Sequence, residues 1–383
     1  MMAKKIGILA FSSCTNYGGM LQVYAMQEAL AMMGHLPVVL NLWVIPNNKY
    51  LYGSAFNPYA GIGTRIKGLK NWIFSKTYRL FEHRYKAFQK WQSVNLHMSK
   101  DVWRTAEEFS LHPPSNVDLI EIGSDQVFNN DVSRIFLCNN VPLSLPRISY
   151  GGSFGGFDKD EAECIRLVDG LSKFSGISVR EKTAQEFVYK LLGYQVPWVV
   201  DPVLLLDRTF WYTVSESFHS KKEEPYIFIY WLGETSLLKE RLSVLRRTVG
   251  DLPIRLIIGA YDAKIMCDIG NVQILWNADP FDFLRELSNA AYVLSNSFHA
   301  MMFSIIYGKK AFFVIGENGR KSSSSRFTDI ATVLHCEKAL HVSLPADRFD
   351  FYDMSKAYHN GQEMIDFSKT VLMKLCCVES GRA

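Results

Sequence analysis

Cysteine is scarce in this sequence and forms no metal-binding pattern. The 383 residues include seven cysteines, none in a Cys-x-x-Cys motif or a Cys/His cluster. An odd number of scattered cysteines is typical of reduced thiols in a cytoplasmic protein, and it argues against a disulfide framework or a zinc site. We therefore expect no metal and no disulfides.

Long apolar runs and a strong net charge are also missing. No stretch reaches the roughly 18 apolar residues that a membrane-spanning helix needs. The opening MMAKKIGILAFSS has a short basic lead and a brief apolar run, which predicts a first strand and not a signal peptide. A net charge of +4 does not by itself indicate a nucleic-acid partner. We expect a soluble, cytoplasmic protein with at most peripheral membrane contact.

What the sequence does contain is an alternation of short strand-like runs with helical patterns. The length favours two domains, because single cores rarely grow this large. The alternation predicts an α/β fold with two tandem Rossmann-like doubly wound domains and ligands in the cleft between them. A polar segment after Leu206 interrupts the alternation. We predict an N-terminal domain over residues 1–208, with a helical insertion at about 60–100, a C-terminal domain over 209–347, and a helical tail over 348–383 that packs on either domain.

His299 lies where a strand-like run meets an apolar run of helical spacing, in YVLSNSFHAMMFSIIYG. In a parallel sheet, such a turn is where ligands bind, because helix amides point into it. The preceding Asn296 and Ser297 are suited to cap the helix. Imidazole has a pKa close to neutrality, so His299 is a candidate general acid or base, unless it is an ordinary capping residue.

Three further turns of this kind occur in the first domain. TNYGGMLQ places Asn16, Tyr17, Gly18 and Gly19 where a backbone can approach a ligand, although it matches neither a dinucleotide nor an ATP phosphate motif. The other two are EIGSDQVFNN, with Ser124 and Asp125, and SYGGSFGG, with Ser153. Asp125 can accept a proton from a hydroxyl group or cap a turn.

Two arginines have the setting of an anion-binding group. Arg180 directly follows a predicted strand, with Glu181 beside it as an alternative ion-pair partner, and Arg326 follows a serine run. A guanidinium presents a fixed fork of donors to a carboxylate or a phosphate. A solvated loop would have the same composition around Arg326.

The segment from Arg65 to Lys90 is basic and rich in aromatic residues, and Glu82 is its only acid. Such a segment suits an anionic membrane or an acidic glycan. A helix pair that packs its aromatic side chains inward is the other interpretation.

Together these stretches resemble the polysaccharide pyruvyl transferase family. The resemblance rests on the order and spacing of KIGILAFSSCTNYGGMLQVYAMQ, IEIGSDQVFNND, SYGGSFG, ISVREKTAQ, VVDPVLLL, SNSFHAMMFSIIYGKKAFFV and SRFTDI. It implies a fold similar to the two-domain GT-B glycosyltransferases, with phosphoenolpyruvate as the donor substrate, no separate cofactor, and a sugar acceptor that is free or lipid-linked.

The resemblance also implies roles for individual residues. His299 is expected to protonate the donor, Arg180 to bind it, and Asp125 to take the hydroxyl proton of the sugar. The C-terminal domain is expected to be the donor side and the N-terminal domain the acceptor side, with the acceptor near Asn16, Tyr17, Gly18, Gly19, Ser124 and Ser153. The sequence departs from the family at Ser297, where characterised members have an arginine. Ser297 is itself expected to contact the donor, and Arg326, or Lys309 with Lys310, is expected to supply the missing charge if the donor is not held differently.

Two other functions stay open at this stage. One is a nucleotide-sugar glycosyltransferase, for which Glu317 is a candidate ribose ligand. The other is a non-catalytic glycan-binding relative that has lost the donor site.

Overall fold

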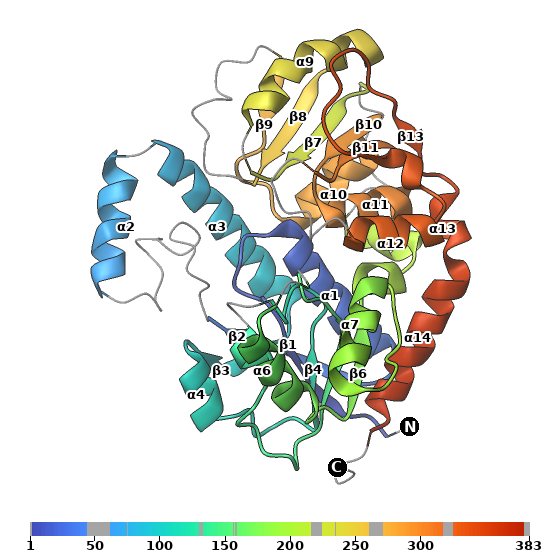
Figure 1. The fold of residues 1–383 in the computed structure, drawn as a ribbon. Helices are drawn as coiled ribbons and strands as arrows, with labels where there is room; N and C mark the ends of the chain where they lie inside the picture. The colour runs from blue at the N-terminus through green and yellow to red at the C-terminus, as the bar shows by residue number, and fades with distance from the viewer. Residues whose placement is uncertain are drawn as a thin grey trace.

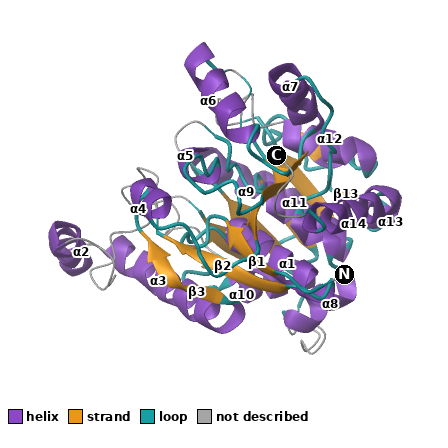
Figure 2. Ribbon diagram, turned by 90° about the horizontal axis from the view of Figure 1, so that it is seen from below, coloured by secondary structure: helices purple, strands orange, loops and turns teal. Residues whose placement is uncertain are grey.

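Two parallel β-sheets, each flanked by helices, make up the molecule (Figures 1 and 2). The coordinates are a computed structural model. It describes residues 2–43, 62–74, 76–129, 133–155, 157, 159–215, 224–233, 235–259, 271–316 and 325–378. The predicted α/β class with two doubly wound sheets is confirmed.

The first sheet has six parallel strands in the order β3-β2-β1-β4-β5-β6. β4 reads LIEI and is buried at every position, as expected of a strand covered on both faces. The strands are β1 (Lys5–Leu9), β2 (Leu36–Leu42), β3 (Met98–Trp103), β4 (Leu119–Ile122), β5 (Arg147–Gly152) and β6 (Gly176–Val179). The helices in this half are α1 (Tyr17–Met32), α2 (Ile62–Phe74), α3 (Lys76–Asn95), α4 (Ala106–Leu111), α5 (Ser133–Phe136), α6 (Glu161–Leu171) and α7 (Lys182–Leu192), followed by the 3₁₀ turn η1 (Pro202–Leu205).

The second sheet repeats this topology. Its parallel strands run in the order β12-β11-β10-β7-β8-β9, which is the first order read from the opposite edge, and β13 adds antiparallel to β11. The strands are β7 (Ile227–Trp231), β8 (Ile254–Ile258), β9 (Val272–Ile274), β10 (Tyr292–Ser295), β11 (Lys310–Val314), β12 (Leu340–His341) and β13 (Tyr352–Asp353). The helices are α8 (Arg208–Val214), α9 (Ser236–Val249), α10 (Pro280–Asn289), α11 (Phe298–Tyr307), α12 (Ser325–Val333), the turn η4 (Glu337–Ala339), α13 (Ala357–Asn360) and α14 (Gln362–Cys376). In each sheet the chain thus reverses the direction in which it adds strands once. The reversal lies between β1 and β4 in the first sheet and between β7 and β10 in the second.

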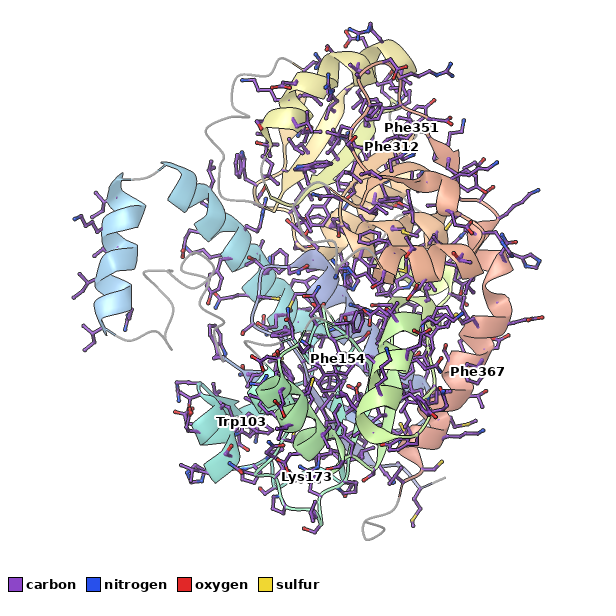
Figure 3. The ribbon with its side chains drawn as sticks, viewed as in Figure 1. Trp103, Phe154, Lys173, Phe312, Phe351 and Phe367 are labelled. Carbon is purple, nitrogen blue, oxygen red and sulfur yellow. The ribbon has the colours of Figure 1, made fainter. Side chains whose placement is uncertain are left out.

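Aromatic side chains fill the interior of both halves (Figure 3). Trp103 packs edge-on against Phe109 in the first, and Phe312 contacts Phe351 in the second. Phe367 on α14 instead points outward, with 51% of its surface exposed.

Helix α1 is buried on nearly all sides because it lies between the two halves. It contacts β1, β2 and η1 on one side and α10 and α11 on the other. The sequence predicted only one apolar stripe on this helix, made of Val23, Met26, Leu30 and Met33. In the structure more of the helix surface is buried than this stripe. A helix that is apolar all round is typical of a position with neighbours on every side.

Tyr17, predicted to lie on the acceptor side of the site, belongs instead to this interface. Only 1% of it is exposed, its ring stacks on Phe283, and its hydroxyl donates to the carbonyl oxygen of Ala278 at 2.9 Å. The ring and the hydroxyl group of Tyr17 are therefore both occupied by contacts within the protein. Tyr17 therefore joins the two halves and is not available to a sugar.

The C-terminal segment returns to the first half of the molecule. Helix α14 lies against η1, β5 and β6, and the two chain ends are on the same side in Figure 1. The sequence had left open which half would hold this tail. The domain limits at residues 208 and 347 stay a prediction.

The basic, aromatic segment forms the helices α2 and α3, of which α2 stands away from the body (Figure 1). The second half of α3 packs inward, because Tyr85, Phe88 and Trp91 are buried. Arg84 is also buried and donates to the carbonyl oxygen of Ile258 in the second half at 2.6 Å. The inward-packing interpretation is therefore confirmed for this part of α3.

Glu121, in the middle of β4, is fully buried. Burial raises the pKa of its carboxyl group to about 8, and the nearby backbone N–H of Tyr150 offsets only part of that rise. The folded protein therefore keeps a proton that the unfolded chain releases above pH about 4.5. Stability is lost as the pH rises from about 4.5 to about 8 and changes little above that.

We predict that Glu121→Gln abolishes this loss, because an amide cannot ionise. At pH about 8 the variant should be more stable than the parent by roughly 3–5 kcal/mol, and near pH about 5 the two should differ little. Urea unfolding at both pH values measures this. An equal difference at both pH values would contradict the assignment.

Candidate active site

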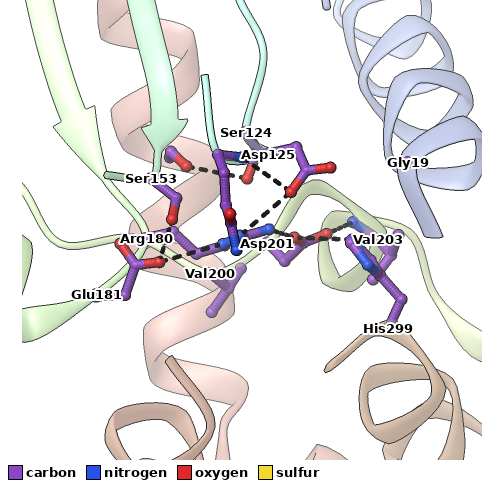
Figure 4. A network of polar contacts seen from close by, with 12 residues as sticks. Gly19, Ser124, Asp125, Ser153, Arg180, Glu181, Val200, Asp201, Val203 and His299 are labelled. Atoms are coloured by element: carbon purple, nitrogen blue, oxygen red, sulfur yellow. Dashed lines mark hydrogen bonds and ion pairs between the residues drawn. The ribbon is translucent and has the colours of Figure 1, made fainter. Parts of the chain in front are cut away.

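The predicted polar residues meet where the carboxyl ends of both sheets face each other. Asn16 follows β1, Asp125 follows β4, Ser153 follows β5, Arg180 follows β6, and His299 follows β10. The turns after β1, β4 and β10 flank the points where the strand order of each sheet reverses, which is where open α/β sheets bind ligands. The network in Figure 4 brings together residues from Ser124 to His299, which belong to different sheets.

Arg180 is the centre of this network. Its side chain is 1% exposed, and its Nη1 lies 2.7 Å from Oδ2 of Asp201. Asp125 and Glu181 each approach the guanidinium to 3.8 Å. Burial lowers the pKa of Arg180, but Asp201, Glu181 and Asp125 outweigh that effect and raise it, so the group stays charged. Its Nε faces Glu181 and its Nη2 faces Asp125 without a hydrogen bond of normal length to either carboxylate.

His299 occupies the first turn of α11. Ser297 is the N-cap, as predicted, and accepts from the backbone N–H of Ala300 at 3.4 Å. Asn296 does not cap the helix, because its side chain bonds both backbone groups of Leu232, at 2.8 and 2.7 Å. Nε2 of the His299 ring lies 3.4 Å from Oδ2 of Asp201. The histidine and Arg180 therefore share one carboxylate oxygen.

Gly18 forms the wall behind the histidine. A Cβ atom on Gly18 would lie 2.1 Å from Nδ1 of His299, so only glycine fits there. At Gly19 the nearest atom to such a Cβ is Sγ of Cys14, at 3.5 Å, which is an ordinary contact. Asn16 caps α1 by accepting from the N–H of Gly19 at 3.2 Å. The close approach predicted for the glycine pair is therefore an approach of Gly18 to His299.

Phe298 holds a second arginine in the site. The guanidinium carbon of Arg180 lies 4.8 Å from the centre of the Phe298 ring, and that of Arg326 lies 5.7 Å from it. Burial, and next the charge of Arg180, lower the pKa of Arg326 to about 10, so it is a cation at neutral pH. Among the described residues no carboxylate lies within ion-pairing distance of Arg326. Its charge is therefore available to an anion.

Asp201 is the residue that sequence reasoning did not place in the site. It is fully buried, its Oδ1 accepts from the N–H of Val203 at 3.2 Å, and its Oδ2 faces both Arg180 and His299. Burial alone would raise its pKa, yet His299 and Arg180 hold that pKa well below its usual value. The signal was present, because VVDPVLLL puts a carboxylate right after an apolar run.

The serines predicted at the site serve mainly to shape its loops. Ser153 is buried and donates to Oε1 of Glu181 at 2.5 Å. Ser124 is buried and donates to the carbonyl oxygen of Gly151 at 3.0 Å. Asp125 is more accessible, with 17% of its side chain exposed. Of these residues, Asp125 is the one whose side chain is accessible from outside.

Lys309, predicted to bind the donor, does not lie with the others. It follows the far end of α11, about 15 Å along the helix from His299. Its Nζ donates to the carbonyl oxygen of Ser288 at 2.8 Å, and burial lowers its pKa to about 8. The lysine satisfies the end of α10, so its assignment to the donor site was wrong. Lys310 begins β11, at the same far edge of the sheet.

Two other features bear on ligands. Within the described part of the chain no group of three or more His, Cys, Asp or Glu residues is placed to hold a metal ion.

A surface cavity of about 520 Å³ lies over α4, α5 and α6, and none of the polar residues above lines it. Its lining includes Ala106, Phe109, Cys138 and Arg166. Glu317 lies outside the described residues.

Comparisons with solved structures place the fold. The chain is similar to UDP-N-acetylglucosamine 2-epimerase from Rickettsia bellii, with a TM-score of 0.53 and 12% identity over 98% of this chain and 96% of that one. For a putative UDP-N-acetylglucosamine 2-epimerase from Listeria monocytogenes the TM-score is 0.51, with 8% identity over 99% of this chain and 92% of that one. UGT89C1 from Arabidopsis thaliana gives 0.46, with 12% identity over 98% and 93%. At these identities the likeness concerns the fold alone.

Comparison of the sequence itself is more specific. No significant match to a curated protein is found. The model of the family described as polysaccharide pyruvyl transferase, however, matches residues 16–318. This range includes α1 with its Gly18 turn, Arg180, Asp201 and His299. This confirms the resemblance seen in the sequence, and the chain belongs to the polysaccharide pyruvyl transferase family.

Proposed function

We propose that this protein transfers the pyruvyl group of phosphoenolpyruvate to hydroxyl groups of a sugar in a surface polysaccharide or its precursor, forms a cyclic ketal, and releases phosphate. The observation that carries the proposal is the convergence of His299, Arg180 and Arg326 around Phe298, where the two sheets meet. Family membership supports the transfer of a pyruvyl group to a polysaccharide.

The two arginines suit a donor that carries both a carboxylate and a phosphate. The charge of Arg180 is largely balanced by Asp201 at 2.7 Å. Arg326 has no such partner among the described residues, and its proximity to Arg180 is unfavourable until an anion binds between them. Arg326 therefore takes over the charge that the family carries at the position of Ser297.

His299 is the proposed acid. As imidazolium it gives a proton to the methylene carbon of phosphoenolpyruvate, and a sugar hydroxyl oxygen attacks the resulting cationic centre. Asp125 takes the hydroxyl proton, and the C–O bond to phosphate then breaks. A second hydroxyl oxygen attacks the same carbon and closes the ketal, and its proton passes to the neutral His299, which restores the acid. Asp201 acts as a positioning residue, because its carboxylate oxygen lies 3.4 Å from Nε2 of the His299 ring.

The acceptor is a hydroxyl-bearing sugar, and both a free and a lipid-linked sugar fit the proposal. Phosphoenolpyruvate is a cytoplasmic metabolite, so we place the reaction in the cytoplasm. No cofactor beyond this donor and no nucleic-acid partner is part of the proposal.

We predict saturable binding of phosphoenolpyruvate that depends on Arg326. Arg326→Gln should weaken binding about tenfold or more, because it removes a charge-assisted hydrogen-bond donor worth roughly 1.5–3 kcal/mol. Lys309→Met is the control and should leave the Kd within about twofold. Calorimetric titration of both variants, beside a panel of nucleotide sugars, measures this. Binding of a nucleotide sugar without binding of phosphoenolpyruvate would replace the proposal with a glycosyltransferase.

We predict that His299→Gln lowers kcat by about 10²–10⁴-fold, the usual contribution of a general acid, with a much smaller change in donor Kd. Asp201→Asn keeps an oxygen for the N–H of Val203 but removes the charge, and it should lower kcat at least tenfold. Phosphate release with purified acceptor measures both, and circular dichroism checks folding. Undiminished kcat in His299→Gln would exclude this residue as the acid.

We predict that Gly18→Ala disrupts the site by pushing the His299 ring away from Asp201. Activity should fall about tenfold or more, with an overpacking cost to stability of about 1–3 kcal/mol. Gly19→Ala is the matched control on the same helix turn and should stay near parental activity, because its Cβ meets only ordinary contacts. Equal activities of the two variants would show that the Gly18 contact does not position the histidine.

A further inference from the structure

Helix α14 has a polar residue in its buried stripe. Ile365, Leu372 and Leu375 lie at helical spacing and are buried, and Ser368 lies among them with 0% of its surface exposed. Burying a hydroxyl group costs free energy unless the group is hydrogen-bonded. A serine at this position therefore needs partners, and these partners identify what the helix holds.

Both partners of the Ser368 hydroxyl group are backbone groups. The hydroxyl donates to the carbonyl oxygen of Met364, one turn earlier in α14, at 2.7 Å. The same oxygen accepts from the backbone N–H of Val200, in the first half of the molecule, at 3.0 Å. Because its proton is committed to Met364, the hydroxyl group acts toward Val200 as an acceptor. An alanine at position 368 could not make this second bond.

Val200 is held on both of its peptide groups, and it directly precedes Asp201 (Figure 4). Its N–H donates to Ser368, and its carbonyl oxygen accepts from the hydroxyl group of Tyr150, on β5, at 3.1 Å. Tyr150, Val200 and Ser368 are all fully buried. Two buried side chains thus fix the backbone from which the carboxylate of Asp201 projects.

Helix α14 also supports the strand that leads to Arg180. A Cβ atom on Gly176, at the start of β6, would lie 2.5 Å from Cδ2 of Leu375, so this strand and the helix are in direct contact. The helix packs on η1 as well, and Asp201 is the N-cap of that turn. It therefore contacts the backbone on both sides of the Arg180–Asp201 ion pair. The family match ends at residue 318 and does not cover this helix.

We propose that Ser368 is a positioning residue of the active site, which acts through Val200 to hold the carboxylate of Asp201 between Arg180 and His299. The effect on catalysis rests on the proposed function, because Asp201 serves pyruvyl transfer through His299. Helix α14 is then a part of the site, and not only a tail that stabilises the first half.

The rate of phosphate release tests the effect on catalysis. Ser368→Ala leaves the buried N–H of Val200 without its acceptor, so kcat should fall about tenfold, and Ser368→Thr, which keeps the hydroxyl group, should recover most of that loss. In an Asp201→Asn background, Ser368→Ala should lower kcat by less than about twofold, because the carboxylate that it positions is already gone. A purely structural role predicts the same loss in both backgrounds.

Thr370 provides the matched control on the same helix. Its hydroxyl group also donates to a carbonyl oxygen one turn back, that of Asp366, at 3.0 Å, but its side chain is exposed. Thr370→Ala should therefore keep the parental kcat. Should Ser368→Ala not fold, Ser368→Cys replaces it in every test, because a thiol fills the same space and is a weak acceptor.

NMR of isotope-labelled histidine tests the proposal without donor or acceptor. The ring-nitrogen signals of His299 are assigned by their loss in His299→Gln. Ser368→Ala should shift the Nε2 signal, since the ring faces Asp201 through this atom, and Thr370→Ala should leave it in place. A shifted signal in a protein that does not use phosphoenolpyruvate would refute the proposed function and keep the positioning role. An unshifted signal, an unchanged kcat in Ser368→Ala of an active parent, or equal losses in both backgrounds would overturn the inference.

Discussion

The carboxylate of Asp201 is the group on which the rest of the site depends. One of its oxygens faces both Arg180 and His299, and the other caps η1. A buried carboxylate is costly unless it is paired, and removing one member of such a pair costs about 3–5 kcal/mol. Because Arg180 follows the last strand of the first sheet and His299 belongs to the second, this carboxylate also ties the two halves together.

The arrangement of the two sheets explains why these groups meet. Both sheets have the same strand order, and their carboxyl ends face each other across α1. Helix α1 therefore serves both halves, with Tyr17 and Gly18 as its contacts to the second one. A single side-chain atom on Gly18 would displace the histidine, so the packing of the two halves and the chemistry of the site are set by the same contact.

Local signals in the sequence were enough to predict the fold class, the strand and helix alternation, and several site residues. His299, Arg180 and Asp125 were found because each follows a strand-like run, and parallel strands end at one edge of a sheet. Lys309 was misassigned because closeness in sequence to His299 was read as closeness in space, although a ten-residue helix separates them. Tyr17 was misassigned because its position in a turn does not reveal that the second half of the molecule covers it.

The sequence by itself determined the α/β architecture, the family and the residues of the strand-to-helix turns, since these depend on short-range periodicity and on motif order. Only the tertiary structure decided which charges pair, that Asp201 is shared, and that Arg326 and not Lys309 stands beside Arg180. The physical reason is that ion pairing, desolvation and burial depend on distances between residues far apart in the chain, and no local pattern encodes those distances.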